Sequence, residues 1–290
     1  MLMKHLAIFV LTVAAVQAQT TTPQPAPQAA AAAPQAVSVP GNISNAPVNK
    51  GNLGTSPWPR PTAQQAYEAS KGKKVRIVLV GDSTMQPGSG YGASFCDLVT
   101  MDTACINEGK GGRSTKSYRE EGSWKTILDY LGKLKPEERS KTWVLIQFGH
   151  NDISPKPDRH ADAATDFPAN MQRFVEELRA AGANPVLVTP LSQRDFKDGQ
   201  VNNHLALYAE ATRKVARDEA VPLLDLNADS VAYLNKVGKV EADTYAPEPA
   251  PSPKFDTTHL GHKGALVFGT MVEFELVTTI PELKPYFQIL

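Results

Sequence analysis

Residues 75–83 of the chain read VRIVLVGDS and give the clearest indication of the fold class. Its first six residues are mostly β-branched and apolar, and they stop at Gly81, which is typical of a strand buried on both faces of a parallel sheet. Other segments share this character, strongly at 143–148 and 185–189, more weakly at 221–226, and briefly at 105–107. We predict a strand in each of them.

Segments with helical spacing separate the later strands. In residues 167–181 apolar side chains recur at i, i+3, i+4 and i+7 from Met171, and Gly182 is suited to end the helix. Comparable spacing predicts helices over 205–220 and 262–277. The alternation of strands and helices predicts an α/β fold with a mainly parallel sheet and helices on both faces. In such sheets the functional site lies at the carboxyl ends of the strands.

The composition excludes several classes of protein. The chain has 290 residues with 30 Lys+Arg against 30 Asp+Glu, so it lacks the basic excess of a nucleic-acid binder, and we expect no nucleic-acid partner. No apolar run reaches the roughly 18–20 residues of a membrane helix. Two cysteines are too few for a four-cysteine zinc site.

The amino-terminal part differs from the rest. Residues 1–18 combine a weakly basic start, a short apolar stretch and small residues up to Ala18, which predicts a signal peptide and a secreted or periplasmic protein. A buried helix is the alternative. Residues 19–50 are rich in Pro, Gln and Ala and predict a disordered linker. We expect one folded domain over 51–290.

Unusual residues follow three of the predicted strands. Ser83 stands just past the first strand, where its hydroxyl can face the edge of the sheet; capping of the next helix is the alternative role. Gly112 lies in a glycine-rich loop whose N–H groups can approach a ligand, or in an ordinary turn. Asn151 can donate its amide to an oxyanion, or form an Asx-turn.

A fourth group lies before the last predicted helix. Asp256 precedes His259 by three residues, so its carboxylate can orient the imidazole and leave the other ring nitrogen free as a general base. A local cap beside a surface histidine is the alternative. Together the four groups provide a nucleophile, a base, an orienting acid and oxyanion donors, and they favour a serine hydrolase.

These residues resemble the four conserved blocks of the SGNH (GDSL-like) hydrolases. The blocks are GDS at 81–83, the glycine loop GGRSTKSY at 111–118, GHND at 149–152, and Asp256-x-x-His259. The chain is most similar to the rhamnogalacturonan acetylesterase family of carbohydrate esterases, over roughly residues 75–277. It departs from that family after Asp152 and at Gln193-Arg194, where members often carry a basic pair.

The resemblance implies a three-layer α/β/α, flavodoxin-like fold and a triad of Ser83, His259 and Asp256. It implies an oxyanion hole formed by the N–H groups of Ser83 and Gly112 and the side chain of Asn151. The implied activity is removal of acetyl groups from acetylated plant cell-wall polysaccharide, foremost rhamnogalacturonan (pectin), with no metal or organic cofactor. The alternatives are an SGNH esterase acting on acetylated xylan, lipid or other acyl esters, and a non-catalytic carbohydrate-binding protein.

Three further expectations concern single residues and assembly. Arg194 is a candidate substrate contact because it falls where the basic pair is altered. Cys96 and Cys105 are nine residues apart and form a disulfide if the protein is exported; two buried thiols are the alternative. We expect a monomer.

Residues 88–93 read GSGYGA and fit a loose dinucleotide-binding pattern, but they begin too far after Gly81 for the required tight turn.

Overall fold

The computed structural model describes residues 60–288. The predicted signal peptide (1–18) and linker (19–50) lie outside these residues. Within them, no helix combines the length and the apolar character needed to cross a membrane.

A parallel sheet forms the centre of the fold. Its strand order is β2-β1-β3-β4-β7, and every neighbouring pair is parallel. The strands are β1 (Val75–Gly81), β2 (Thr103–Asn107), β3 (Thr142–Gln147), β4 (Asn184–Val188) and β7 (Leu223–Leu224). The order reverses at β1, because β2 lies on one side of it and β3 on the other. Loops leaving β1 and β3 therefore diverge, which is where open α/β sheets bind their ligands.

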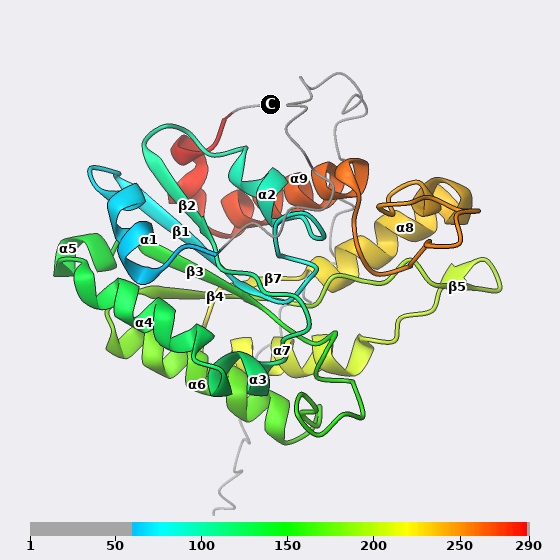
Figure 1. Cartoon of the computed structure of the whole chain (residues 1–290), viewed down its shortest axis with the longest axis horizontal. Helices are drawn as coiled ribbons and strands as arrows, with labels where there is room; N and C mark the ends of the chain where they lie inside the picture. The colour runs from blue at the N-terminus through cyan, green and yellow to red at the C-terminus, as the bar shows by residue number, and fades with distance from the viewer. Residues whose placement is uncertain (1–59, 289–290) are drawn as a thin grey trace, which may run out of the picture. The chain divides into compact units, whose positions relative to one another are not determined.

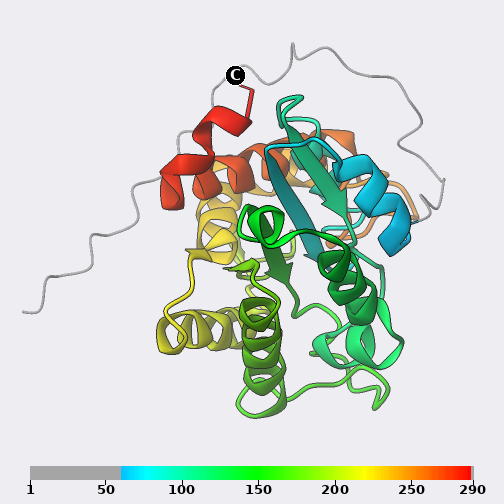
Figure 2. The same cartoon turned by 90° about the vertical axis from the view of Figure 1, so that its left-hand side faces the viewer.

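Helices cover both faces of the sheet (Figure 1). One layer contains α1 (Ala63–Ser70), α3 (Thr115–Glu120), α4 (Ser123–Lys133), α6 (Asp166–Ala180) and α7 (Ala206–Asp218), and the other contains α2 (Gly92–Cys96), α8 (Leu226–Asp243) and α9 (His262–Thr279). The short helices α5 (Pro136–Arg139) and η2 (Pro281–Tyr286) complete the set. In Figure 2 the strands separate the red helix α9 from the green helices of the first layer.

Alternate side chains of each strand enter two separate cores. Val78 and Val80 of β1 pack with Phe174 of α6, whereas Ile77 and Leu79 pack with α9. All four β1 side chains are fully buried. This double burial explains the continuous apolar run in the sequence, and it confirms the predicted α/β/α layers and parallel sheet.

The structure contains two long helices that the sequence did not predict, α4 and α8, and its strands differ from the prediction mainly after β4. The strand expected over 221–226 is only two residues long, because α8 begins at Leu226. A small antiparallel pair, β5 (Phe196–Lys197) and β6 (Gln200–Val201), was not predicted. Its turn uses positive φ angles at Asp198 and Gly199. A two-residue strand is too short to show the alternation on which strand prediction depends.

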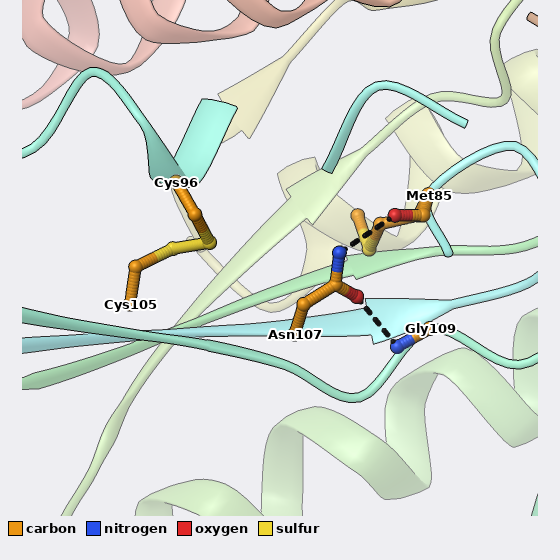
Figure 3. The surroundings of a disulfide bond; sticks show 5 residues. All are labelled: Met85, Cys96, Cys105, Asn107 and Gly109. Atoms are coloured by element: carbon orange, nitrogen blue, oxygen red, sulfur yellow. Dashed lines mark hydrogen bonds between the residues drawn. A yellow bond between two sulfur atoms is a disulfide. The ribbon is translucent and has the colours of Figure 1, made fainter. Parts of the chain in front are cut away.

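A disulfide bond joins Cys96 at the end of α2 to Cys105 of β2, with the Cα atoms 5.4 Å apart (Figure 3). Nearby, Asn107 at the end of β2 donates to the carbonyl of Met85 at 3.0 Å and accepts from the N–H of Gly109 at 2.9 Å. The disulfide thus holds the end of α2 against β2, and Asn107 holds the loop after β1 against the loop after β2.

We expect the disulfide to stabilise the fold without contributing to chemistry. Closing a loop of nine residues restricts the unfolded chain, so replacing both cysteines by alanine should lower the free energy of unfolding by roughly 2–3 kcal/mol. Urea unfolding of the variant measures this loss. Thiol titration of the denatured, unreduced protein should find no free thiol, and two reactive thiols there would contradict the bond.

Candidate active site

The turn after β1 presents Ser83 at the carboxyl edge of the sheet. The buried carboxylate of Asp82 accepts hydrogen bonds at 2.8 Å from both the N–H and the hydroxyl of Thr84. The carbonyl of Asp82 accepts from the N–H groups of Met85 and Gln86, at 3.2 and 3.0 Å. These bonds fix the peptide that carries the N–H of Ser83. Ser83 itself is half-buried, so its hydroxyl remains accessible.

Three side chains form a hydrogen-bonded chain, one from the turn after β1 and two from the turn before α9. Nε2 of His259 lies 3.0 Å from Oγ of Ser83, and Nδ1 of His259 lies 3.3 Å from Oδ2 of Asp256. Because a carboxylate accepts hydrogen bonds, the proton of the neutral ring is assigned to Nδ1, which leaves Nε2 as the acceptor for the serine hydroxyl. This is the arrangement of a nucleophile, a general base and an orienting acid.

The second oxygen of Asp256 makes the local turn that sequence analysis offered as an alternative. Oδ1 accepts from the N–H groups of His259 and Thr258, at 2.6 and 2.8 Å. Burial acts to raise the pKa of Asp256, but these two N–H groups and the imidazole lower it, and the net effect holds the pKa below its usual range. The same carboxylate therefore shapes the turn and stays ionised beside His259.

The prediction that Arg194 contacts substrate is wrong. Its side chain is only 1% exposed. The guanidinium donates to the carbonyls of His259 at 2.6 Å, Asp256 at 3.0 Å and Thr258 at 3.4 Å. Burial lowers the pKa of Arg194 to about 10, against the opposing effect of Asp256 and Asp243. The charged side chain thus supports the turn that carries the histidine.

The glycine loop after β2 holds one peptide in a defined orientation. Gly112 has a φ of +76°, which favours glycine. Nη1 of Arg113 donates to the carbonyl of Gly111 at 2.7 Å. Carbonyl and N–H of one trans peptide point in opposite directions, so the N–H of Gly112 points away from that guanidinium. Among residues 60–288, neither this N–H nor that of Ser83 has a hydrogen-bond acceptor.

Asn151 connects the loop after β3 to the glycine loop. Its Nδ2 donates to the carbonyl of Arg113 at 3.1 Å. Its Oδ1 accepts no hydrogen bond from residues 60–288, so the Asx-turn considered above does not form. One of the two amide protons is engaged in this bond. The other is available to a ligand, as are the free N–H groups of Ser83 and Gly112.

Asp152 supplies a second connection between these loops. Its buried Oδ1 accepts from the N–H of Thr115 at 2.9 Å and from the hydroxyl of Thr115 at 2.6 Å, at the start of α3. Burial raises the pKa of Asp152 to about 7, although the Thr115 donors oppose the shift. The sequence placed Asp152 in the GHND block but carried no sign of its partner, since Thr115 lies 37 residues away.

The chain is similar to several known proteins. The model of the GDSL-like Lipase/Acylhydrolase family matches residues 79–266, which include Ser83, Asp256 and His259. Two relatives come from Bacillus subtilis (strain 168). The probable rhamnogalacturonan acetylesterase YesY is 32% identical over 58% of this chain and 78% of its own length. The rhamnogalacturonan acetylesterase RhgT is 30% identical over 69% of this chain and 88% of its own length.

A solved structure shares the fold. The crystal structure of YxiM from Bacillus subtilis superposes with a TM-score of 0.58 and 25% identity. The match covers 71% of this chain and 56% of YxiM, so the chain corresponds to little more than half of that protein. From the family match, the relatives and the shared fold, we conclude that this chain belongs to the GDSL-like lipase/acylhydrolase (SGNH hydrolase) family and is a carboxylic ester hydrolase.

Proposed function

We propose that this esterase removes acetyl groups from acetylated rhamnogalacturonan, with Ser83 as the nucleophile, His259 as the general base and Asp256 as the orienting acid. The observation that carries the proposal is the contact of 3.0 Å between Ser83 and His259, with Asp256 behind the imidazole. The acetyl group and the polymer are suggested by RhgT and YesY, whose names state that activity.

The first half of the reaction forms an acetyl-enzyme. Oγ of Ser83 attacks the acetyl carbonyl while Nε2 of His259 takes its proton, and the carboxylate of Asp256 stabilises the imidazolium. The N–H groups of Ser83 and Gly112 and the free amide proton of Asn151 donate to the oxyanion. The tetrahedral intermediate then collapses, and the imidazolium protonates the departing sugar oxygen.

The second half releases acetate. His259 removes a proton from water, which attacks the acetyl-enzyme through the same oxyanion geometry. The imidazolium returns the proton to Oγ of Ser83 as the ester bond breaks. Acetate leaves, and the Ser83–His259 hydrogen bond forms again.

Basic side chains beside the oxyanion loop support a charged polymer as substrate. Residues 109–118 carry Lys110, Arg113 and Lys116, and one carboxylate, that of Glu121, pairs with both Lys110 and Arg113. Residues 153–160 add Lys156 and Arg159, with Asp158 beside Arg159 at 3.3 Å, so the basic side chains still outnumber the acidic ones. Nη1 of Arg159 is the atom closest to the open side of Gly112, 3.8 Å from where a side chain there would begin. Rhamnogalacturonan contains galacturonate, and a guanidinium pairs well with its carboxylate, whereas the xylan backbone is neutral.

We propose export on separate grounds. The basic start, the apolar stretch and the small residues up to Ala18 support a signal peptide. An extracellular or periplasmic location is also where disulfides such as Cys96–Cys105 persist.

The proposed function is tested by acetate release from acetylated rhamnogalacturonan and acetylated xylan, assayed side by side with Ser83→Ala. We expect release from rhamnogalacturonan, and a fall of about 10⁶-fold in kcat in the variant, as in other serine hydrolases that lose the nucleophile. Asn151→Ala should lose about 10²–10³-fold in kcat with little change in KM. Retention of most activity by Ser83→Ala would refute the nucleophile. Release from xylan alone would replace the substrate, and polymer binding without any release would favour a carbohydrate-binding protein.

Activity should fall on the acid side of the pH profile. Protonated His259 cannot accept the serine proton. The lowered pKa of Asp256 keeps that carboxylate ionised over the same fall, so Asp256 does not contribute to it. Burial raises the pKa of Asp152 to about 7, so protonation of Asp152, which joins the loop after β3 to Thr115, can steepen the fall. Initial rates of aryl acetate hydrolysis across the acidic range measure it, and a flat acid limb would contradict the role of His259.

Arg159→Gln tests the preference for a charged polymer. Loss of one charge-assisted hydrogen bond should reduce kcat/KM on acetylated rhamnogalacturonan by about 10–100-fold. Activity on an aryl acetate and on acetylated xylan without glucuronate side groups should stay near the wild-type level, because neither contains a carboxylate. Arg139→Gln is the matched control, since Arg139 in α5 precedes β3 and lies at the opposite edge of the sheet. An equal loss on all three substrates would mean that Arg159 stabilises the loop and does not contact the polymer.

A further inference from the structure

The turn that follows Ser83 contacts both the glycine loop and the segment that carries His259. The hydroxyl of Ser89 donates to the carbonyl of Ser83 at 2.7 Å. Nε2 of Gln86 in turn donates to the hydroxyl of Ser89 at 3.1 Å. The peptide between Ser83 and Thr84 is therefore held at both ends, because its N–H also donates to Asp82.

The other end of Gln86 holds the oxyanion loop. Oε1 of Gln86 accepts from the N–H of Gly111 at 2.6 Å, one residue before the proposed donor Gly112. The two segments lie so close that a Cβ on Gly109 would stand 2.7 Å from the backbone nitrogen of Gln86. Asn107 also joins the two segments, because its side chain donates to the carbonyl of Met85 and accepts from the N–H of Gly109 (Figure 3). Movement of Gln86 would therefore move the glycine loop relative to Ser83.

The backbone of Ser89 holds the segment that carries the base. Its carbonyl accepts from the N–H of Leu260 at 2.8 Å. The same peptide unit contains the carbonyl of His259, which accepts from Arg194 at 2.6 Å. The peptide after the histidine is thus fixed from both sides, by Ser89 and by Arg194.

The donors and acceptors of these hydrogen bonds can be assigned in one consistent way. The N–H of Gly111 requires the oxygen of the Gln86 amide, which turns the amide NH₂ toward Ser89 and leaves the Ser89 proton for the carbonyl of Ser83. We propose that Gln86 and Ser89 are positioning residues, which fix the oxyanion loop in its place relative to the nucleophile. This inference rests on the proposed function, and neither side chain takes part in the chemistry itself.

The test is the effect of Gln86→Met and Ser89→Ala on the hydrolysis of an aryl acetate. Methionine keeps the length of glutamine but can neither accept from Gly111 nor donate to Ser89. Because misplacement by about 1 Å can cost about 10²-fold in rate, we expect each variant to lose about 10–100-fold in kcat, with KM changed less than about two-fold. The affinity for phenylboronic acid, which forms a tetrahedral adduct with an active serine, should fall by the same factor as kcat/KM.

Controls separate positioning from general destabilisation. Ser89→Thr keeps the hydroxyl and should restore kcat. Gln172→Met is matched to Gln86→Met, since within residues 60–288 the side chain of Gln172 hydrogen-bonds only to Glu176 on the exposed side of α6, and it should leave kcat unchanged. Unfolding temperatures of all variants identify any that fold poorly, in which case Ser89→Ala, the smaller change, decides.

Two results would overturn the inference. An unchanged kcat in both Gln86→Met and Ser89→Ala would show that the bonds do not position the site. A rise in KM with kcat unchanged would make Gln86 a substrate contact instead. Either result leaves the proposed function intact as long as Ser83→Ala abolishes activity in the wild-type background, so the two claims fail separately.

Discussion

The parallel pairing of β1 with β3 is the constraint on which the site depends. In this register Gly81 lies opposite Gln147, so the two strands end at the same level of the sheet. A side chain on Gly81 would collide with the carbonyl of Gln147 at 2.7 Å, and the glycine is therefore required where the chain turns toward Ser83. The loops that leave the two strands carry Ser83 and Asn151. Burial of both faces of the strands in two apolar cores makes slippage of this register costly, because a shift of one residue would exchange the faces of every side chain.

The sheet alone does not complete the site, because its reacting groups lie on loops. Loops are more mobile than the elements they connect, and here polar side chains tie them together in pairs. Asp152 joins the loop after β3 to α3 through Thr115, Asn151 joins the same loop to Arg113, and Arg194 holds the turn of Asp256 and His259. Most of these bonds end on backbone groups, which have fixed directions. A site built in this way can keep the N–H groups of Ser83 and Gly112 without acceptors within residues 60–288, which is what the proposed oxyanion hole requires.

Much of this arrangement was predictable from sequence. The apolar runs ending in Gly-Asp-Ser and Gly-His-Asn-Asp predicted both the strands and the chemistry at their ends, and the spacing of Asp256 and His259 predicted their contact. Arg194 was assigned the wrong role because a buried guanidinium and an exposed one look alike in a sequence, and its partners are backbone carbonyls more than 60 residues away. Ser89 lies within a glycine-rich stretch that resembles a nucleotide-binding pattern, and nothing local reveals that its contacts reach Ser83 and Leu260. Long-range polar contacts of this kind leave no periodicity, so they need the folded structure.

We propose that the folded chain activates Ser83 as a nucleophile through His259. The most direct measurement is labelling of the native protein with a fluorophosphonate, followed by peptide mass spectrometry. We predict one adduct per chain, on Ser83, formed much more slowly in His259→Ala and absent from the unfolded protein. Adducts on another serine, or no adduct in a folded protein that still releases acetate, would contradict the account.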